Sequence, residues 1–124
     1  MRTNIKTTNI TLTPEISDYL SKRLAGFEKV ITHDSEVALV DVEIGRTTKH
    51  QSGDIYRAEI NIHIRHKSFR AVKETDDLYT SIDAAKDQMM EELRTNKEKR
   101  ISLLRRGGTR VKALIKGLRS WRRR

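Results

Sequence analysis

The sequence predicts an α+β domain whose strands and helices follow one another in the order β-α-β-β-β-α. Two segments carry apolar residues at spacings of three and four, which marks one face of a helix. Other segments alternate apolar and polar residues, as strands with one buried face do. We expect a four-stranded, mainly antiparallel sheet with both helices on one face, because that arrangement buries every apolar stripe most simply.

The amino-terminal third contains the first strand and the first helix. We expect the strand at residues 2–7 and the helix at residues 12–31. Thr13 can cap this helix, Pro14 suits its first turn, and Glu15 is favourable at the positive end of the helix dipole. The apolar face of the helix is expected to consist of Ile16, Leu20, Leu24, Phe27 and Val30.

The middle of the sequence contains three further strands, at residues 37–45, 56–66 and 67–74. Their apolar and polar residues alternate, so one face of each strand is expected to be buried. A polar loop is expected at residues 46–54, and a tight turn near residues 66–68. The residues expected to face the core are Ala38, Val40, Val42, Ile44, Ala58, Ile60, Ile62, Ile64, Phe69 and Ala71.

The second helix follows the last strand, and Thr75 or Asp76 is expected to cap it. A sheet about 20–25 Å across is covered by about 17 helical residues, because each adds ~1.5 Å. That length ends near Leu93, so we expect the helix to continue beyond the sheet without an apolar face. The stripe before that point consists of Leu78, Ile82, Ala85, Met89 and Leu93.

The basic residues are concentrated in the last quarter of the 124-residue chain. Residues 1–93 contain 13 Lys and Arg against 16 Asp and Glu, a balance of −3. Residues 94–124 contain 13 Lys and Arg against Glu98 alone, a balance of +12. This asymmetry indicates a polyanionic partner, most often a nucleic acid. Because aromatic residues are scarce, we expect binding to follow phosphate position and RNA shape more than base sequence.

Several other function classes are not supported by the sequence. There is no cysteine, which excludes thiolate catalysis and cysteine-based zinc sites. His63 and His66 would lie on opposite faces of a strand, which suits no single metal ion. No phosphate-binding glycine loop and no paired catalytic residues are present. We therefore expect no enzyme, metal, cofactor or small-molecule substrate, and a cytoplasmic protein without a signal or membrane-spanning segment.

The chain is expected to divide into a domain at residues 1–106 and a basic tail at residues 107–124. Gly107 and Gly108 indicate a hinge before an amphipathic segment too short for a stable isolated helix. We expect this tail to be flexible alone and to fold on RNA or on a protein partner. A helix lying on an anionic membrane is the alternative. Its candidate contacts are Arg110, Lys112, Lys116, Arg119, Trp121, Arg122, Arg123 and Arg124.

Three stretches together resemble one protein family. They are "NIKTTNITLTPEI" (residues 4–16), "DDLYTSID" (76–83) and "LRTNKEKR" (93–100). They are similar to the opening, the second-helix signature and the lysine-rich continuation of the short ribosome hibernation promoting factors, also called ribosome-associated translation inhibitors. The resemblance covers residues 1–100 and does not extend to the dimerisation domain of the long members, so we expect no self-pairing through that domain.

The resemblance implies both a fold and a function. The fold is a sheet backed by two helices and related to double-stranded RNA-binding domains. The function is to enter the channel between the head and body of the small (30S) ribosomal subunit, bind 16S rRNA, compete with mRNA and tRNA, and hold idle ribosomes inactive. A general structured-RNA-binding module or RNA chaperone is the alternative.

The resemblance also points to individual residues. Lys97 and Lys99 match basic residues of the family's second helix, and Arg23 matches one of the first helix. Tyr79 matches the signature tyrosine, which we interpret as a packing residue with a polar tip. The chain departs from the family at Gln88, Glu91 and Thr95, where basic residues are usual, so the contact surface is expected to be shifted toward the carboxyl end. The full set of expected rRNA contacts is Arg23, Lys86, Arg94, Lys97, Lys99, Arg100, Arg105 and Arg106.

Overall fold

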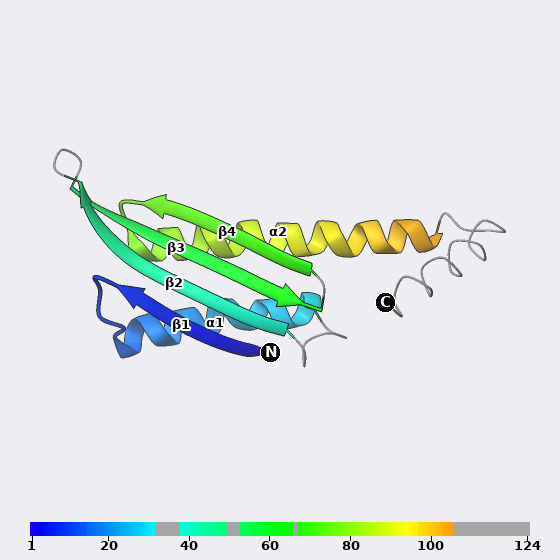
Figure 1. The fold of residues 1–124 in the computed structure, drawn as a ribbon, viewed down its shortest axis with the longest axis horizontal. Coiled ribbons are helices and arrows are strands. Elements are labelled where there is room, and N and C mark those ends of the chain that lie inside the picture. The colour runs from blue at the N-terminus through cyan, green and yellow to red at the C-terminus, as the bar shows by residue number, and fades with distance from the viewer. Residues whose placement is uncertain (32–37, 50–52, 66, 106–124) are drawn as a thin grey trace. The chain divides into compact units, whose positions relative to one another are not determined.

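The computed structural model describes residues 1–31, 38–49, 53–65 and 67–105 (Figure 1). The predicted order of elements is confirmed: β1 (Arg2–Thr8), α1 (Pro14–Ile31), β2 (Ala38–Lys49), β3 (Gly53–Ile64), β4 (Lys67–Thr75) and α2 (Leu78–Arg105). By its internal contacts the chain divides between Leu93 and Arg94, inside α2. The predicted tail lies outside the described residues.

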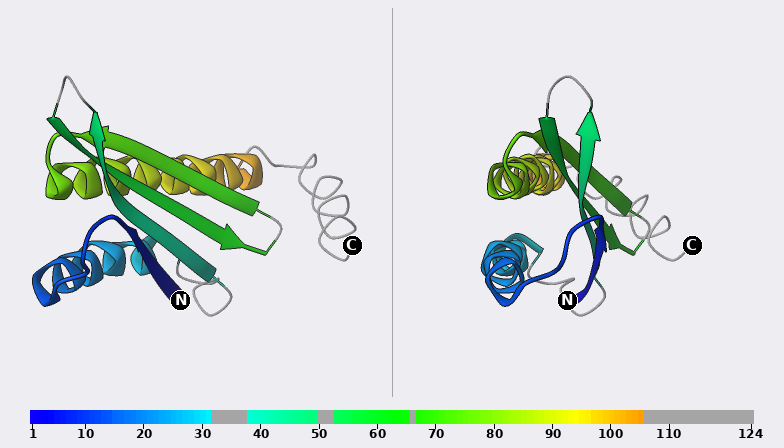
Figure 2. Two further views of the ribbon diagram at one scale, coloured as in Figure 1. Left: turned by 60° about the vertical axis from the view of Figure 1, so that its left-hand side comes forward. Right: turned by 90° about the vertical axis from the view of Figure 1, so that its left-hand side faces the viewer.

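Within the described residues, four strands form one sheet in the order β1-β2-β3-β4. β1 runs parallel to β2, from the pair Arg2 and Leu39 to the pair Thr8 and Gly45. The β2–β3 and β3–β4 pairs are antiparallel. The parallel pair requires a crossover connection, which α1 provides. Both α1 and the part of α2 before Arg94 cover the same face of the sheet, and no described helix covers the opposite face, which we call the open face (Figure 2).

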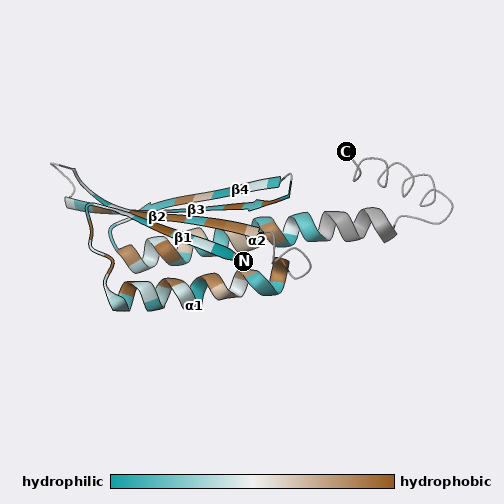
Figure 3. Ribbon diagram, turned by 60° about the horizontal axis from the view of Figure 1, so that its bottom comes forward, coloured by the Kyte–Doolittle hydropathy of each residue, from teal (hydrophilic) through white to brown (hydrophobic). Residues whose placement is uncertain are grey.

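The core lies between that face and the two helices. All the strand residues expected to face inward are buried, except Ile64 and Phe69, which are half-buried against the core. The whole predicted stripe of α2, from Leu78 to Leu93, is buried as well. The stripe of α1 differs at both ends, because Ile16 and Val30 are only half-buried, whereas Ile31 is buried. Figure 3 shows the apolar sides of both helices turned toward the sheet.

The connections between strands are shorter than expected. β2 continues to Lys49 and β3 begins at Gly53, and these two residues form the last pair of the β2–β3 ladder. Most of the polar loop predicted at 46–54 therefore belongs to the two strands. Polar side chains are compatible with these positions, because a ladder is held by its backbone hydrogen bonds and Thr47 is a good strand residue. The second connection lies between Ile64 and Lys67, which pair with each other, so it begins slightly earlier than the turn predicted near residues 66–68.

The amino-terminal cap of each helix is a hydrogen-bonded side chain. Thr13 Oγ1 accepts the backbone N–H of Ile16 at 3.2 Å, which confirms the predicted cap of α1. The predicted cap of α2 at Thr75 or Asp76 is wrong. Asp77 is the cap, because its Oδ2 accepts the backbone N–H of Thr80 at 2.9 Å and the Thr80 hydroxyl at 2.8 Å. These hydrogen bonds lower the pKa of the Asp77 carboxyl.

Thr75 has a different function at the start of α2. Its hydroxyl accepts the backbone N–H of Asp77 at 3.2 Å and lies 2.6 Å from the hydroxyl of Ser81. Ser81 is fully buried, and its Oγ is 2.8 Å from the carbonyl oxygen of Tyr56 on β3. The first turn of α2 is therefore attached to the sheet by hydrogen bonds as well as by apolar packing.

Candidate nucleic-acid interface

On the helical side of the fold, Tyr19, Arg23 and Asp83 form a cluster that joins α1 to α2. The hydroxyl of Tyr19 lies 2.7 Å from both carboxylate oxygens of Asp83. The Nε of Arg23 lies 3.0 Å from Asp83 Oδ1, and its Nη2 donates to the Tyr19 hydroxyl at 3.0 Å. Each member therefore contacts the other two. We refer to these three residues as the Tyr19–Arg23–Asp83 cluster.

Aromatic contacts support this cluster. The guanidinium carbon of Arg23 lies 4.7 Å from the centroid of the Tyr19 ring, which is within cation–π range. The Tyr19 and Tyr79 rings meet edge to face, with centroids 4.7 Å apart. The hydrogen bond to Asp83 is the main cause of a raised pKa for the Tyr19 hydroxyl, which stays a donor at neutral pH. Tyr79 has this packing contact and remains 37% exposed.

The cluster changes the interpretation of Arg23 as an expected phosphate contact. Its side chain is 44% exposed, so a ligand can reach it. Its charge, however, is already paired with the Asp83 carboxylate. The guanidinium of Arg23 is therefore fixed in place by Asp83 and Tyr19. The sequence had suggested an exposed cation without an ion-pair partner.

Lys86, the other expected contact on this side, lies where the two helices approach closely. Its side chain is 24% exposed, and its Nζ lies 3.7 Å from Asp87 Oδ1. Gly26 of α1 faces it: a Cβ on Gly26 would lie 3.9 Å from Lys86 Cε and 3.3 Å from the Met90 methyl group. Gly26, which weakens the helix by about 1 kcal/mol relative to Ala, thus permits the close approach of α1 and α2.

The rest of α2 before Arg94 is acidic. Residues 78–93 contain four acidic residues and a single basic one, Lys86. Asp87 and Glu91 are exposed, and Gln88 donates to Glu92 Oε1 at 3.4 Å. This part of the helix therefore offers little attraction to a polyanion.

The basic segment, residues 94–106, begins directly after Leu93, which is the last buried residue among those with described side chains. Arg94 and Lys97 are exposed and have no ion pair with a described side chain. Lys99, Arg100 and Arg105 belong to the same helix, but their side chains lie outside the described residues. The same holds for the whole of Arg106 and for the predicted tail contacts from Arg110 to Arg124.

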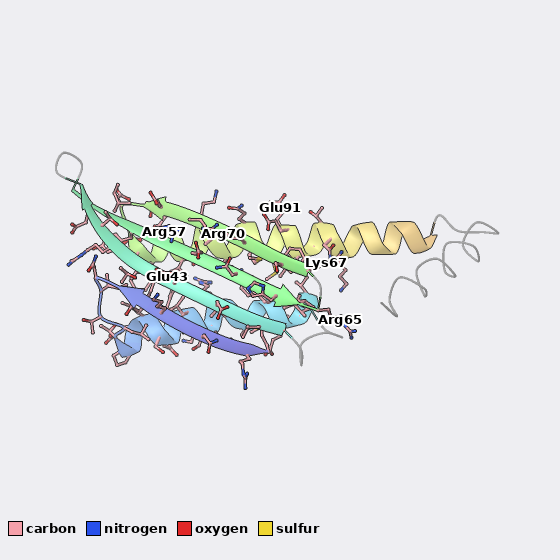
Figure 4. All side chains as sticks on the ribbon, in the orientation of Figure 1. Glu43, Arg57, Arg65, Lys67, Arg70 and Glu91 are labelled. Carbon is pink, nitrogen blue, oxygen red and sulfur yellow. The ribbon has the colours of Figure 1, made fainter. Side chains whose placement is uncertain are left out.

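The open face of the sheet carries a polar network that sequence reasoning did not predict. Glu59 lies at its centre and is only 15% exposed. Its Oε1 accepts hydrogen bonds from Arg57 and Arg70, both at 2.7 Å, and its Oε2 accepts one from Asn61 at 3.0 Å. These hydrogen bonds outweigh burial and lower the pKa of the Glu59 carboxyl. Figure 4 shows Glu43, Arg57 and Arg70 on this face.

Separate polar pairs on the same face link other strands of the sheet. Asn4 on β1 donates to Asp41 Oδ1 at 3.2 Å. His63 Nδ1 lies 2.9 Å from the Ser68 hydroxyl, and its Nε2 lies 3.9 Å from Asp41 Oδ2. The strict alternation of residues 56–66 had shown that this face is polar. It could not show the pairing, which depends on the register of three strands.

This open face is a weaker candidate for nucleic-acid binding than the basic segment. Its charges are largely paired with one another, and the strand register places no Phe, Tyr or Trp on it among the described residues. Bases would therefore find no stacking platform there. Elsewhere, no three metal-ligating side chains meet within the described ranges. No helix in the same part of the chain has the length and apolar character needed to cross a membrane.

Comparison with known proteins gives consistent matches. A model of the family described as "Sigma 54 modulation protein / S30EA ribosomal protein" matches residues 3–101. The ribosome hibernation promotion factor of Picosynechococcus sp. is 32% identical over 100 residues, which are 80% of this chain and 50% of that protein. The chain thus spans half the length of that relative.

Two other matches cover nearly the whole of the matched protein. The ribosome hibernation promoting factor of Pseudomonas putida is 30% identical over 110 residues, which are 89% of this chain and 100% of that protein. A ribosomal subunit interface protein from Coxiella burnetii has a similar structure, with a TM-score of 0.64 and 14% identity, covering 79% of this chain and 99% of that one. The structural match confirms the fold.

Proposed function

Because the chain belongs to the Sigma 54 modulation protein / S30EA ribosomal protein family, we propose that it binds ribosomes and keeps idle ribosomes inactive. It occupies the mRNA and tRNA channel of the small subunit in the cytoplasm, competes with both RNAs and carries out no catalysis. The names of the relatives, ribosome hibernation promotion or promoting factors, support this function.

The observation that carries the proposal is the change in α2 at Leu93. Before this residue the helix buries an apolar stripe, and its charged residues are mostly acidic. After it, up to Arg105, the helix has five basic residues and one acidic residue, Glu98, and the described side chains of Arg94 and Lys97 are exposed. Each Lys or Arg that neutralises a phosphate releases condensed counterions, which is the main source of affinity for a nucleic acid.

The proposed contacts with 16S rRNA fall into two groups. The first is the basic segment, with Arg94, Lys97, Lys99, Arg100, Arg105 and Arg106 as phosphate contacts. The second is Arg23 and Lys86 on the helical side of the fold, where Arg23 is partly neutralised by Asp83. The tail at 107–124 adds further basic residues and Trp121 for RNA or a ribosomal protein. Binding should depend on phosphate positions, because the described strands place no aromatic side chain on the open sheet face for bases to stack on.

The decisive experiment separates this function from that of a general RNA-binding module. Purified small subunits and the full chain are sedimented together with increasing amounts of free 16S rRNA as competitor. We expect the chain to stay with the subunits, because only the folded subunit presents the channel. Transfer to free rRNA at equal concentration would favour the RNA chaperone alternative. As a second readout, preloading the subunits with mRNA and initiator tRNA should reduce binding, since these ligands occupy the same channel.

A further inference from the structure

Arg23 is the expected rRNA contact whose surroundings are best defined, because both of its partners lie within the described residues. We propose that Asp83 and Tyr19 make Arg23 a selective hydrogen-bond donor. Arg23 then binds flexible polyanions weakly, and it binds a phosphate well only when that phosphate is held at one position relative to the guanidinium. Asp83 and Tyr19 are then positioning residues that determine specificity. This inference rests on the proposed function, since it concerns how one phosphate of the RNA is recognised.

The first argument is the charge of the cluster. The Arg23 Nε and the Asp83 Oδ1 are 3.0 Å apart, well within the screening length of about 8–10 Å at moderate salt. A polyanion farther away than the screening length therefore approaches a pair whose net charge is zero. It gains little electrostatic free energy from Arg23. Counterion release, which drives non-specific binding, requires a cation that is not already neutralised.

The second argument is the geometry of the guanidinium. Its planar fork presents five N–H donors in fixed directions. The two contacts described above engage Nε and Nη2, and neither of them uses Nη1. The Tyr19 ring lies against the guanidinium at 4.7 Å and is itself packed against Tyr79. The orientation of Arg23 is therefore set before a ligand arrives, which favours a phosphate that fits it.

The sequence offers a matched control at Asp87, one turn beyond Asp83 on α2. Its side chain is 76% exposed, and its ion-pair partner is Lys86 at 3.7 Å. Asp83→Asn and Asp87→Asn change the net charge equally. Only the first removes the carboxylate that contacts Arg23, because Asp87 acts on Arg23 at longer range and pairs with Lys86. The part of the Asp83→Asn effect that exceeds the Asp87→Asn effect and disappears in the Arg23→Ala background is therefore the part that passes through Arg23.

The test is a double-mutant cycle with a poly(uridine) single strand as the loosely fitting probe and purified small subunits as the structured one. Asp83→Asn and Asp87→Asn are each measured alone and combined with Arg23→Ala, over a range of salt concentrations. We expect Asp83→Asn to raise the poly(uridine) affinity about two- to fivefold more than Asp87→Asn does, the range typical of an exposed ion pair. For Asp83→Asn, the slope of log poly(uridine) affinity against log salt concentration should become steeper by about 0.7, the value for one added single-strand phosphate contact.

Two further expectations distinguish the possible results. In the Arg23→Ala background the excess effect of Asp83→Asn should vanish, and with Arg23 present the ratio of subunit to poly(uridine) affinity should fall. Equal effects of the two Asn variants, or an excess that persists without Arg23, would overturn the proposal. If the unmodified chain fails to bind subunits, the proposed function is wrong, and the poly(uridine) cycle still decides the role of Asp83.

A second variant keeps the test valid if Asp83→Asn does not fold, as judged by thermal unfolding. Tyr19→Phe removes one hydrogen-bond partner of Arg23 and Asp83 without changing the net charge. We expect it to lower the ratio of subunit to poly(uridine) affinity by a smaller factor, and to lose this effect in the Arg23→Ala background. An unchanged ratio in a folded Tyr19→Phe variant would exclude Tyr19 from the mechanism.

Discussion

The two parts of helix α2 on either side of Leu93 differ in almost every respect except their backbone. Residues 78–93 bury an apolar stripe and carry four acidic residues against one basic residue. Residues 94–105 carry five basic residues against one acidic residue, and no described side chain among them is buried. One continuous helix thus contains a packing part and a charged part. The difference teaches that binding and folding can be altered separately by substitutions only a few residues apart.

The largest effect on stability is expected at the boundary itself. Leu93→Ala should lower the free energy of unfolding by about 2–5 kcal/mol, because a buried leucine leaves a cavity. Thr95→Ala, two residues later and exposed, should change it by less than about 0.5 kcal/mol. Urea unfolding of both variants measures the difference. Similar losses in the two variants would mean that the packing part extends past Leu93.

The largest effect on binding is expected from the charged part. Replacing Lys97, Lys99 and Arg100 by Ala should leave the fold intact. It should reduce the slope of log affinity against log salt by about 2–3, which is ~0.7–0.9 for each lost phosphate contact. Subunit binding at several salt concentrations measures this slope.

A control for this variant removes three positive charges from the rest of the chain, at Lys6, Lys22 and Lys29. All three side chains are exposed, and none of them is an expected rRNA contact. In this control variant, the slope of log affinity against log salt should change much less than in the Lys97, Lys99 and Arg100 variant. Equal losses in both variants would show that net charge, and not the position of the basic segment, governs binding.

A smaller effect is expected from deleting residues 107–124. The domain should remain folded, because Phe27, Ile82, Met89 and the other core residues form one buried cluster that lies within residues 1–93. The residence time on small subunits should shorten, since the deletion removes seven Lys and Arg as well as Trp121. Surface-immobilised subunits give the dissociation rate, and thermal unfolding checks the fold. An unfolded deletion variant would place the apolar stripe of the tail in the core.

The smallest effect is expected from the pH dependence of Glu59 on the open face. Its pKa is lower in the folded chain than in the unfolded chain, so the unfolded state binds a proton more readily. The stabilisation is therefore fully present above the ordinary pKa of a glutamate and is lost as pH falls through the folded value. Glu59→Gln should flatten the decline of unfolding free energy in this acidic range. Parallel curves for the two proteins would mean that the Arg57 and Arg70 contacts contribute nothing.

The sequence predicted the fold well because its strongest signals are periodic. The alternation of residues 56–66 and the stripe from Leu78 to Leu93 depend only on spacing, and spacing is fixed by strand and helix geometry. The choice of cap for α2 failed, because Thr75, Asp76 and Asp77 are adjacent and all three residue types can cap a helix. Only the hydrogen bonds of Thr80 select Asp77.

The candidate site was less predictable, because its contacts join residues far apart in the chain. Tyr19 and Asp83 are 64 residues apart, and no local pattern links them. The network around Glu59 likewise depends on the pairing of β3 with β4. By contrast, the basic segment was visible as a local excess of charge. It could be found without knowing which residues meet in space.

The parallel pairing of β1 with β2 has a consequence for the order of folding. β2, β3 and β4 follow one another through short turns, so their contacts close small loops. β1 can join the sheet only after the chain has passed through α1, and this longer loop costs more entropy to close. We therefore expect the β2–β3–β4 meander to form early and β1 to be added late. The first strand made during synthesis would then be the last to be placed in the sheet.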